Sequence, residues 1–291
     1  MNHTIPKEDR ALNGQKIKIT PQEFEQFCQF LEQACGILLA KHKQYLVESR
    51  LSKILLDGQF TSLGQLVVTF ERPGNSRLKE QVINAMTTNE TLWFRDIHPY
   101  EILKDKLLPE LAEKSSSQRL KIWSAACSTG QEPYSISMII DEFKEQNSGA
   151  FRMGEEIIAT DISTRVLDQA RLAEYEMLAL GRGLSQDRLK KFFEPGVRDA
   201  WKLLPKIKKR VTFKELNLLG AYNGIGPCDI VFCRNVLIYF SSERKQDILQ
   251  KIHKTLKPGG YLLLGASESI GELHNLFEMV HCRPGIIYRA K

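Results

Sequence analysis

One stretch constrains the fold of this chain more than any other: residues 120–135, L-K-I-W-S-A-A-C-S-T-G-Q-E-P-Y-S. It runs from an apolar strand pattern through a loop of small residues into a helix, the layout with which open α/β sheets hold nucleotide-like ligands. Residues 124–130 contain no side chain larger than Cys or Thr, so a ligand can lie directly against the backbone. A turn whose small residues serve only close packing is the competing interpretation.

The chemistry of this loop narrows the class of ligand. It lacks the three glycines of a dinucleotide fingerprint and the Gly-Lys-Ser/Thr of a phosphate-binding loop. No basic residue lies between Ser124 and Tyr134, whereas Glu132 is present. An acidic residue here suits an amino or sulfonium group better than a pyrophosphate, so the stretch points to S-adenosylmethionine.

Composition and charge exclude several other classes of protein. Of the 291 residues, 42% are hydrophobic and 26% charged, as in an ordinary soluble globular protein, and the net charge of +6 is too small for a nucleic-acid binder. There is no apolar run of ~20 residues and no signal-peptide pattern, so we expect a cytoplasmic protein that does not insert into membranes. The six cysteines form no C-x-x-C, and we expect no metal.

The N-terminal third reads as helical. We expect a loose tail over residues 1–18, a helical domain over 19–86 with four helices, and a linker with an amphipathic helix over 87–118. The first helix starts at a capping box, T-P-Q-E. The second carries a basic run with Glu48 as its one acid before Asp57, which is either a solvated face or a docking surface for an acidic helix; its cations are Lys41, His42, Lys43, Arg50 and Lys53.

The linker opens with an unusually polar motif, M-T-T-N-E-T-L-W-F-R-D. Thr87 and Glu90 can form a capping box. Asn89, Thr91 and Arg95 would then fall on nearby helical positions and present an amide, a hydroxyl and a guanidinium to one site.

From residue 119 onward strands and helices alternate. We expect strands at 120–123, 156–161, 211–217, 228–233 and 261–264, and a final antiparallel edge strand at 285–289. Residues 175–210 interrupt this order as an insertion of a short helix and small strands. The pattern predicts an α/β fold with a doubly wound, mainly parallel sheet over 119–291, a small inserted β-subdomain and an all-helical domain in front.

Polar residues follow four of the predicted strands, and ligands of open α/β sheets bind at those carboxyl ends. For an adenosyl amino acid, Glu132 would face the amine, Asp161 the ribose hydroxyls, and Asn217 with Leu218 the adenine. Arg234 and Asn235 follow the fourth strand. Asp161 as a plain N-cap for the helix after it is a second interpretation, compatible with the first.

Together with their flanks these motifs closely resemble the chemotaxis-receptor glutamate O-methyltransferases of the CheR type. The resemblance rests on M-T-T-N-E-T-x-x-F-R-D, W-S-A-A-C-S-T-G-Q-E-P-Y-S, A-T-D-I, N-L-L, F-C-R-N-V-L-I-Y-F and P-G-G-x-L-L-L-G-x-S-E-S, in this order. It implies a Rossmann-like class I S-adenosylmethionine methyltransferase domain that forms methyl esters on glutamates of membrane chemoreceptors during sensory adaptation, with S-adenosylhomocysteine as product.

The resemblance also implies roles for individual residues. The cofactor contacts would be Asn89, Thr91, Arg95, Glu132, Asp161, Asn217, Leu218, Arg234 and Asn235. Arg95 and Tyr239 would lie nearest the reacting methyl, as the catalytic residues. Gln131 departs from the family, which usually has a second acid there.

Two other classes of function stay open. A methyltransferase of RNA or a small molecule would share the cofactor site but gives no reason for the helical domain. A catalytically dead regulatory module is the non-enzyme alternative, and the intact cofactor positions disfavour it.

The inserted segment bears on how a receptor is recognised. Some members of the family capture the receptor's C-terminal pentapeptide on this subdomain, through a glycine-rich turn. Here the turn F-E-P-G-V-R-D is short and has one glycine, and Pro195 removes a backbone donor from an edge strand. We therefore expect independence of the pentapeptide and docking of the receptor's methylation region through Arg50 and Lys53.

Overall fold

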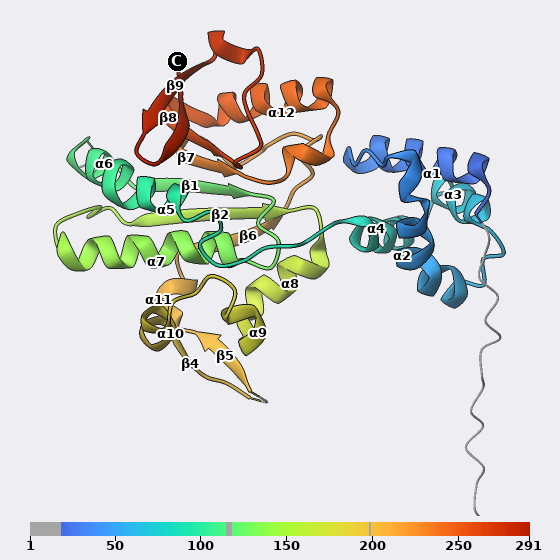
Figure 1. Cartoon of the computed structure of the whole chain (residues 1–291), viewed down its shortest axis with the longest axis horizontal. Helices are drawn as coiled ribbons and strands as arrows, with labels where there is room; N and C mark the ends of the chain where they lie inside the picture. The colour runs from blue at the N-terminus through green and yellow to red at the C-terminus, as the bar shows by residue number, and fades with distance from the viewer. Residues whose placement is uncertain (1–18, 115–117, 198) are drawn as a thin grey trace, which may run out of the picture. The chain divides into compact units, whose positions relative to one another are not determined.

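The computed structural model describes residues 19–114, 118–197 and 199–291, so the predicted tail over 1–18 lies outside it. The chain divides into two compact units (Figure 1). The described part of the first is residues 19–30 and 40–86, and that of the second is residues 31–39, 87–114, 118–197 and 199–291. Residues 31–39, which the sequence analysis assigns to the helical domain, thus belong to the second unit.

The first unit is built from helices. They are α1 (Pro21–Cys35), whose last five residues belong to the second unit, α2 (Gln44–Asp57), α3 (Leu63–Glu71) and α4 (Ser76–Met86), with a 3-10 turn, η1 (Lys41–Lys43), before α2. Thr20 and Glu23 form the expected capping box: the Thr20 amide donates to Glu23 Oε2 at 2.9 Å and the Glu23 amide to Thr20 Oγ1 at 3.3 Å. Apolar residues at helical spacing supply a buried core that includes Phe27, Val47 and Leu51.

A seven-stranded sheet forms the centre of the second unit, in the order β6-β2-β1-β7-β8-β10-β9. Its strands are β1 (Leu120–Ala125), β2 (Glu155–Asp161), β6 (Val211–Glu215), β7 (Cys228–Cys233), β8 (Leu256–Leu264), β9 (Phe277–Cys282) and β10 (Gly285–Ala290). The first five in sheet order are parallel, and β10 is antiparallel to both β8 and β9. The predicted fold class, mainly parallel and doubly wound, is confirmed.

Both faces of this sheet are covered, because strand side chains alternate between two apolar layers. Ile122 packs in one layer and Trp123 in the other. The helix α7 (Gln131–Gln146) covers the first layer. The helix α12 (Ser242–Thr255) covers the second layer, on the opposite side of the sheet (Figure 1). α8 (Thr164–Leu172) follows β2. The chain reverses direction across the sheet between β1 and β7, which is where such folds bind ligands.

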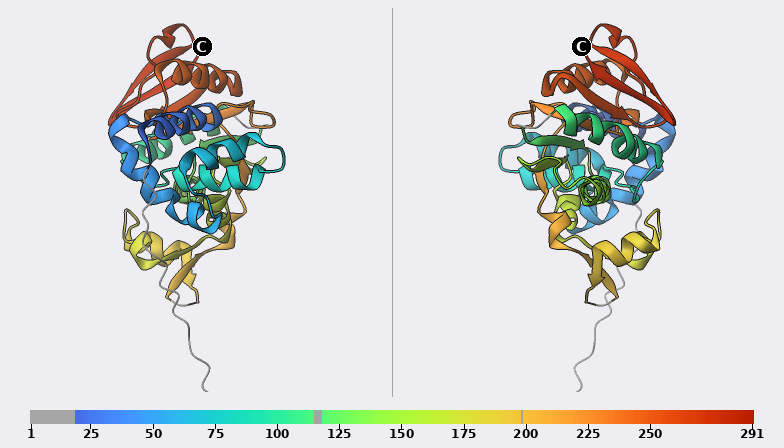
Figure 2. Two further views of the ribbon diagram at one scale, coloured as in Figure 1. Left: turned by 90° about the vertical axis from the view of Figure 1, so that its right-hand side faces the viewer. Right: turned by 90° about the vertical axis from the view of Figure 1, so that its left-hand side faces the viewer.

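The insertion forms a small subdomain at the opposite end of the second unit from β9 (Figure 2). It contains β3 (Glu174–Glu176), α9 (Met177–Leu180), α10 (Gln186–Phe192), β4 (Phe193–Pro195), β5 (Ala200–Leu203) and α11 (Pro205–Lys208). Its three strands are antiparallel with β5 in the centre. The ring of Trp93, in the segment before α5 (His98–Ile102), makes edge-to-face contacts with Tyr175 and Phe193 of this subdomain, at 5.0 and 5.5 Å between ring centroids.

Two expectations are wrong. The last strand, β10, is not an edge strand, because β9 pairs outside it. Residues 87–97 are not helical, so Thr87 and Glu90 cap no helix and Asn89, Thr91 and Arg95 are not at helical positions. The helix begins only at α5 (His98–Ile102) and continues through a π-helical turn, η2 (Leu103–Leu107), into α6 (Leu108–Lys114).

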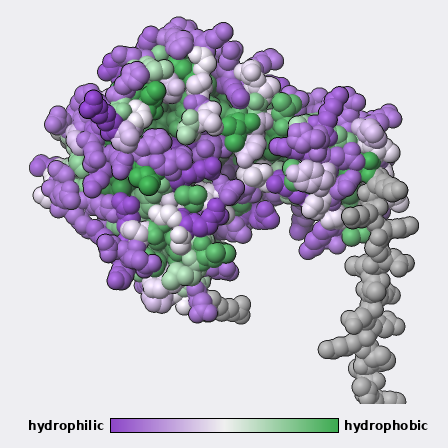
Figure 3. All heavy atoms as spheres, in the orientation of Figure 1, coloured by the Kyte–Doolittle hydropathy of each residue, from purple (hydrophilic) through white to green (hydrophobic). Residues whose placement is uncertain are grey.

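The surface is mostly hydrophilic on the face drawn in Figure 3, with apolar side chains scattered among polar ones. Among the residues that the structure describes, no helix has the length and apolar character that a membrane span requires.

Candidate active site

The loop after β1 makes a sharp turn that depends on a glycine. Ala126, Ser128 and Gly130 have φ angles of 58°, 50° and 94°, so the chain turns sharply before α7. A Cβ on Gly130 would lie 3.0 Å from the Cβ of Ala170 and 3.1 Å from the Tyr134 ring, and its backbone is left-handed, so only glycine fits well. The first turn of α7 therefore opens directly at the carboxyl edge of β1.

Glu132 lies in that first turn, and its carboxylate is fixed from two sides. Oε1 accepts a hydrogen bond from Ser124 Oγ at 2.8 Å, and Oε2 accepts one from Arg234 Nη1 at 3.1 Å. Burial raises the pKa of Glu132 above its ordinary value, and the Arg234 charge opposes that rise. A buried carboxylate of this kind favours a cationic ligand, as predicted for the amine of S-adenosylmethionine.

Asp161 is the last residue of β2, and its carboxylate binds the loop after β1 (residues 126–130), which is called the ligand loop below. The Oδ2 of Asp161 accepts the Ser128 amide and its Oδ1 the Ser163 amide, each at 2.9 Å. Ser163 is the N-cap of α8, so the interpretation of Asp161 as a plain N-cap is wrong. Burial raises the pKa of this carboxyl as well. A carboxylate has about four acceptor positions, so Asp161 can also accept a hydrogen bond from a ribose hydroxyl.

Arg234 follows β7, and only 1% of its side chain is exposed. Besides Glu132, its guanidinium donates to Asp96 Oδ2 at 2.7 Å and to the Arg95 carbonyl at 2.9 Å. Its charge also lies 5.8 Å from the centre of the Tyr100 ring. The guanidinium thus binds protein groups from two segments far apart in the sequence.

The next residue, Asn235, is held by a carboxylate that sequence reasoning missed. Glu268 Oε2 accepts the amides of Asn235 and Gly265, both at 2.8 Å, and Glu268 Oε1 accepts the Ile238 amide at 3.3 Å. The signal for Glu268 was present in the S-E-S that ends the last resembling motif. Its spacing gave no role, because two of its three partners are backbone amides of another loop.

The segment 87–97 runs beside the ligand loop. Ser128 Oγ donates to the Asn89 carbonyl at 2.8 Å, and the Asn89 amide group donates to Thr87 Oγ1 at 3.1 Å. Arg95 is half-buried and its Nη1 donates to the Glu90 carbonyl at 3.3 Å. Asn89 and Arg95 are thereby brought to the same edge as Glu132 and Asp161, and Thr91 lies half-buried between them.

Three other predicted residues have different surroundings. Asn217 donates to the Ala34 carbonyl at 2.8 Å and accepts the Leu219 amide at 3.0 Å, so its side chain shapes the loop after β6. Leu218 is buried in the same apolar layer as Trp123. Tyr239 is half-buried, and within the described part of the chain its hydroxyl makes no hydrogen bond with Arg95.

The electrostatic balance of this edge is acidic. Glu132 and Asp96 pair with the buried guanidinium of Arg234, and Asp161 at the end of β2 and Glu268 after β8 add two further carboxylates. A sulfonium or ammonium group is favoured in such surroundings. No group of three His, Cys, Asp or Glu arranged to hold a metal ion occurs among the described residues.

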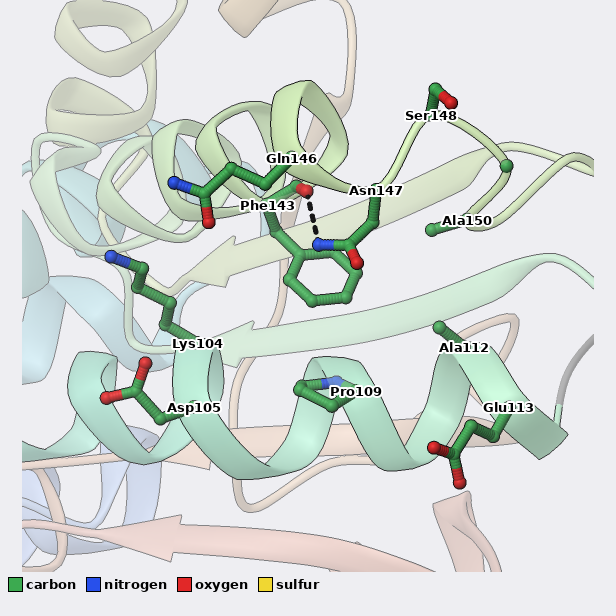
Figure 4. Close-up of a pocket in the computed structure, with 11 residues that line it drawn as sticks. Lys104, Asp105, Pro109, Ala112, Glu113, Phe143, Gln146, Asn147, Ser148 and Ala150 are labelled. Atoms are coloured by element: carbon green, nitrogen blue, oxygen red, sulfur yellow. Dashed lines mark hydrogen bonds between the residues drawn. The ribbon is translucent and has the colours of Figure 1, made fainter.

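A separate groove of about 740 Å³ lies between α6 and the last turn of α7 (Figure 4). Glu113 and Lys104 line one side, and Phe143 and Asn147 line the other, where the Asn147 amide group donates to the Phe143 carbonyl. None of the predicted site residues lines it. Because α7 begins at the ligand loop, this groove is at the other end of that helix.

A doubly wound sheet with buried carboxylates at its carboxyl edge is the layout of Rossmann-like proteins that bind nucleotide-like ligands. Residues 89–286 match the family described as CheR methyltransferase, SAM binding domain, and residues 22–87 match its all-alpha domain. The chain therefore belongs to the CheR methyltransferase family, as the resemblance indicated.

Several curated relatives are similar over nearly their full length. Chemotaxis protein methyltransferase Cher2 of Pseudomonas putida is 55% identical, over 92% of this chain and 98% of the relative. Chemotaxis protein methyltransferase 1 of Pseudomonas aeruginosa is also 55% identical, with the same coverage. The chemotaxis protein methyltransferase of Escherichia coli is 33% identical, over 91% of this chain and 90% of the relative.

Proposed function

We propose that this protein methylates glutamate side chains of chemoreceptors, with S-adenosylmethionine as methyl donor. The observation that carries the proposal is the buried Glu132, fixed between Ser124 and Arg234 at the start of α7. It lies in a chain whose 55% identical relatives are named chemotaxis protein methyltransferases.

The residues at the edge divide the binding of the cofactor between them. Glu132 binds the amine of the methionyl part, and Asp161 accepts hydrogen bonds from the ribose hydroxyls. Leu218 offers an apolar contact to the adenine, while Asn217 fixes the loop that carries it. Asn89, Thr91 and Asn235 complete the set of proposed contacts, with Arg234 acting alongside Glu132.

The reaction requires no general base from the protein. The bound cofactor supplies a methyl group on a positively charged sulfur. A glutamate with a pKa of ~4.3 is already ionised at neutral pH, so its oxygen can form the new C–O bond without a general base. The electron pair of the broken C–S bond stays on sulfur, and S-adenosylhomocysteine is released. In-line placement of oxygen and methyl can supply ~7–11 kcal/mol of the barrier reduction.

Arg95 and Tyr239 are the residues that we assign to the reacting groups. Arg95 is half-buried at the edge, and its Nη1 donates to the Glu90 carbonyl at 3.3 Å. A substrate carboxylate can replace this long bond with a stronger, charge-assisted one. The Tyr239 hydroxyl is available for the same carboxylate. A tight ion pair with Arg95 would lower the nucleophilicity of the glutamate, so the role is orientation.

Recognition of the receptor would use the helical unit. Lys53 is exposed on α2, as are Lys41 and His42 in the turn before it, and they suit the acidic methylation region of a receptor. Arg50 contributes differently: its Nη1 donates to the Met86 carbonyl at the end of α4, at 2.7 Å. Arg50 therefore supports the docking face, and Lys53 provides free charge.

The chemistry of the product tests the proposal. Purified protein is incubated with methyl-labelled S-adenosylmethionine and receptor-containing membranes. Methyl esters release labelled methanol in mild base, whereas N-methyl or C-methyl products do not. Label in RNA or small molecules would favour the alternative methyltransferase, and binding of S-adenosylhomocysteine without any transfer would favour the regulatory module.

A further inference from the structure

The backbone beside Arg95 has an unusual conformation. Phe94, Asp96 and Ile97 have φ angles of 49°, 66° and 55°, so three of four consecutive residues have a positive φ although none of them is glycine. Ile97 is also β-branched and 63% exposed, so its own side chain does nothing to stabilise this turn. Such a conformation persists only where surrounding contacts hold it, and it marks functional segments.

The contacts that hold the turn come from both of its ends. At the start, the Phe94 amide donates to Ser135 Oγ at 3.2 Å, and the Phe94 ring packs against the Arg188 guanidinium at 3.9 Å. At the end, Arg234 donates to the Arg95 carbonyl at 2.9 Å and to Asp96 Oδ2 at 2.7 Å. Arg95 therefore lies between two fixed points.

The same guanidinium reaches Glu132 at 3.1 Å, and burial of 99% of its side chain leaves it little access to a ligand. Its Nε is buried and has no partner within the described part of the chain. A buried arginine with three acceptors from protein groups acts through those groups. Arg234 connects the carboxylate that we assign to the cofactor amine with the turn that carries Arg95.

We propose that Arg234 and Asp96 are a positioning pair for methyl transfer: they hold residues 94–97 in the strained turn that aims the Arg95 guanidinium at the substrate carboxylate. This inference rests on the proposed function, because the substrate that Arg95 orients is the receptor glutamate. It assigns Arg234 a different primary role from that of a cofactor contact, and it gives Asp96 a role that the motif alone did not indicate.

Asp96 is the better position for a test, because its side chain is 31% exposed and its removal disturbs the fold less than removal of the buried Arg234. Asp96→Ala should lower kcat about tenfold and change KM for S-adenosylmethionine less than twofold. Asp96→Asn keeps one oxygen acceptor for Arg234 and should recover part of the rate. Asp105→Ala, which removes an exposed carboxylate from η2, is the matched control and should leave kcat unchanged.

A double variant separates positioning from general damage. If Asp96 acts through Arg95, then Arg95→Ala with Asp96→Ala should be no slower than Arg95→Ala alone. Losses that multiply in the double variant would overturn the proposal.

A second measurement needs no activity. In Asp96→Ala, amide hydrogen exchange over residues 94–98 should be at least tenfold faster than in the wild type, with and without S-adenosylhomocysteine. Unchanged exchange would overturn the positioning role whatever the substrate is. Failure of the proposed function would instead appear as slow amide exchange over residues 94–98 in a wild-type protein that forms no base-labile ester.

Discussion

Asp161 is the residue on which cofactor binding should depend most. Asp161→Ala removes the acceptor for the ribose hydroxyls, and it also leaves the Ser128 and Ser163 amides without their partner. Affinity for S-adenosylhomocysteine should fall at least tenfold, equivalent to ~1.4 kcal/mol, and the free energy of unfolding should fall by about 1–3 kcal/mol. Calorimetry and thermal melting check the two effects. Unchanged affinity would show that the cofactor does not reach Asp161.

Arg95 and Tyr239 should affect turnover more than cofactor affinity, because their proposed roles concern the substrate carboxylate. Arg95→Ala and Tyr239→Phe should bind S-adenosylhomocysteine within about threefold of the wild type and methylate receptors at least tenfold more slowly. Parallel losses of binding and rate would make both residues ordinary cofactor contacts. The comparison requires calorimetry and initial rates on the same preparations.

Glu23 offers a test by pH in the helical unit. Hydrogen bonds from the Thr20 amide and, at 3.1 Å, from the Gly64 amide at the start of α3 lower the pKa of this carboxyl to about 2. A lowered pKa stabilises the fold above the unfolded value of ~4.3, and this stabilisation is lost as the pH falls toward 2. Because the side chain is largely solvated, the effect should be about 1 kcal/mol.

The measurement compares the wild type with Glu23→Gln, which keeps one acceptor oxygen for the capping box. The difference in melting temperature should be present at pH 6 and shrink as the pH falls to 3. A difference that is independent of pH would contradict the assignment of the lowered pKa to these hydrogen bonds.

At the scale of elements, the strands that could be predicted from the sequence are those buried on both faces of the sheet. β7 is buried along its whole length and is apolar apart from Asp229, and β1 and β2 are buried at all but one position each. β9 was missed because Glu278, Met279 and His281 are exposed and leave no continuous apolar run. The segment 87–97 was misjudged for another reason: contacts from Ser135, Arg188 and Arg234, distant in the sequence, impose its turn.

The candidate site shows the same division. Glu132 and Asp161 could be predicted as candidates because a helix start after a small-residue loop and the end of a strand are local signals. Glu268 and the buried environment of Arg234 could not, because their partners lie 33 and 138 positions away in the chain. The local sequence pattern predicts the position of a residue in a strand or helix, whereas the contacts of its side chain depend on how the whole sheet is assembled.

Receptor recognition is predicted to use α2 and not the inserted subdomain. β4 is only three residues long and ends in Pro195, and a Cβ on Gly196 would lie 2.9 Å from the Ala200 carbonyl, so the turn is tight. Calorimetry of the receptor's C-terminal pentapeptide should therefore show no binding, and a receptor without its tail should be methylated at the full rate. Micromolar binding of the pentapeptide would contradict this.

Docking through α2 is tested by reversing a charge. Lys53→Glu should raise KM for receptor membranes at least threefold and leave S-adenosylhomocysteine affinity unchanged, because α2 belongs to the helical unit. Arg77→Glu, an exposed cation on α4, is the matched control. Equal effects of the two variants would indicate a general charge effect instead of a docking site.

The whole molecule combines a helical unit with a methyltransferase unit, and the central claim is that its substrate is a receptor glutamate. Peptide mass spectrometry of receptors incubated with the protein and S-adenosylmethionine tests this most directly. The account predicts the mass gain of one methyl group on glutamates of the cytoplasmic methylation region, formed at least tenfold more slowly with Arg95→Ala and reversed by mild base. Methylation that resists base, or that falls on another residue type, would contradict it.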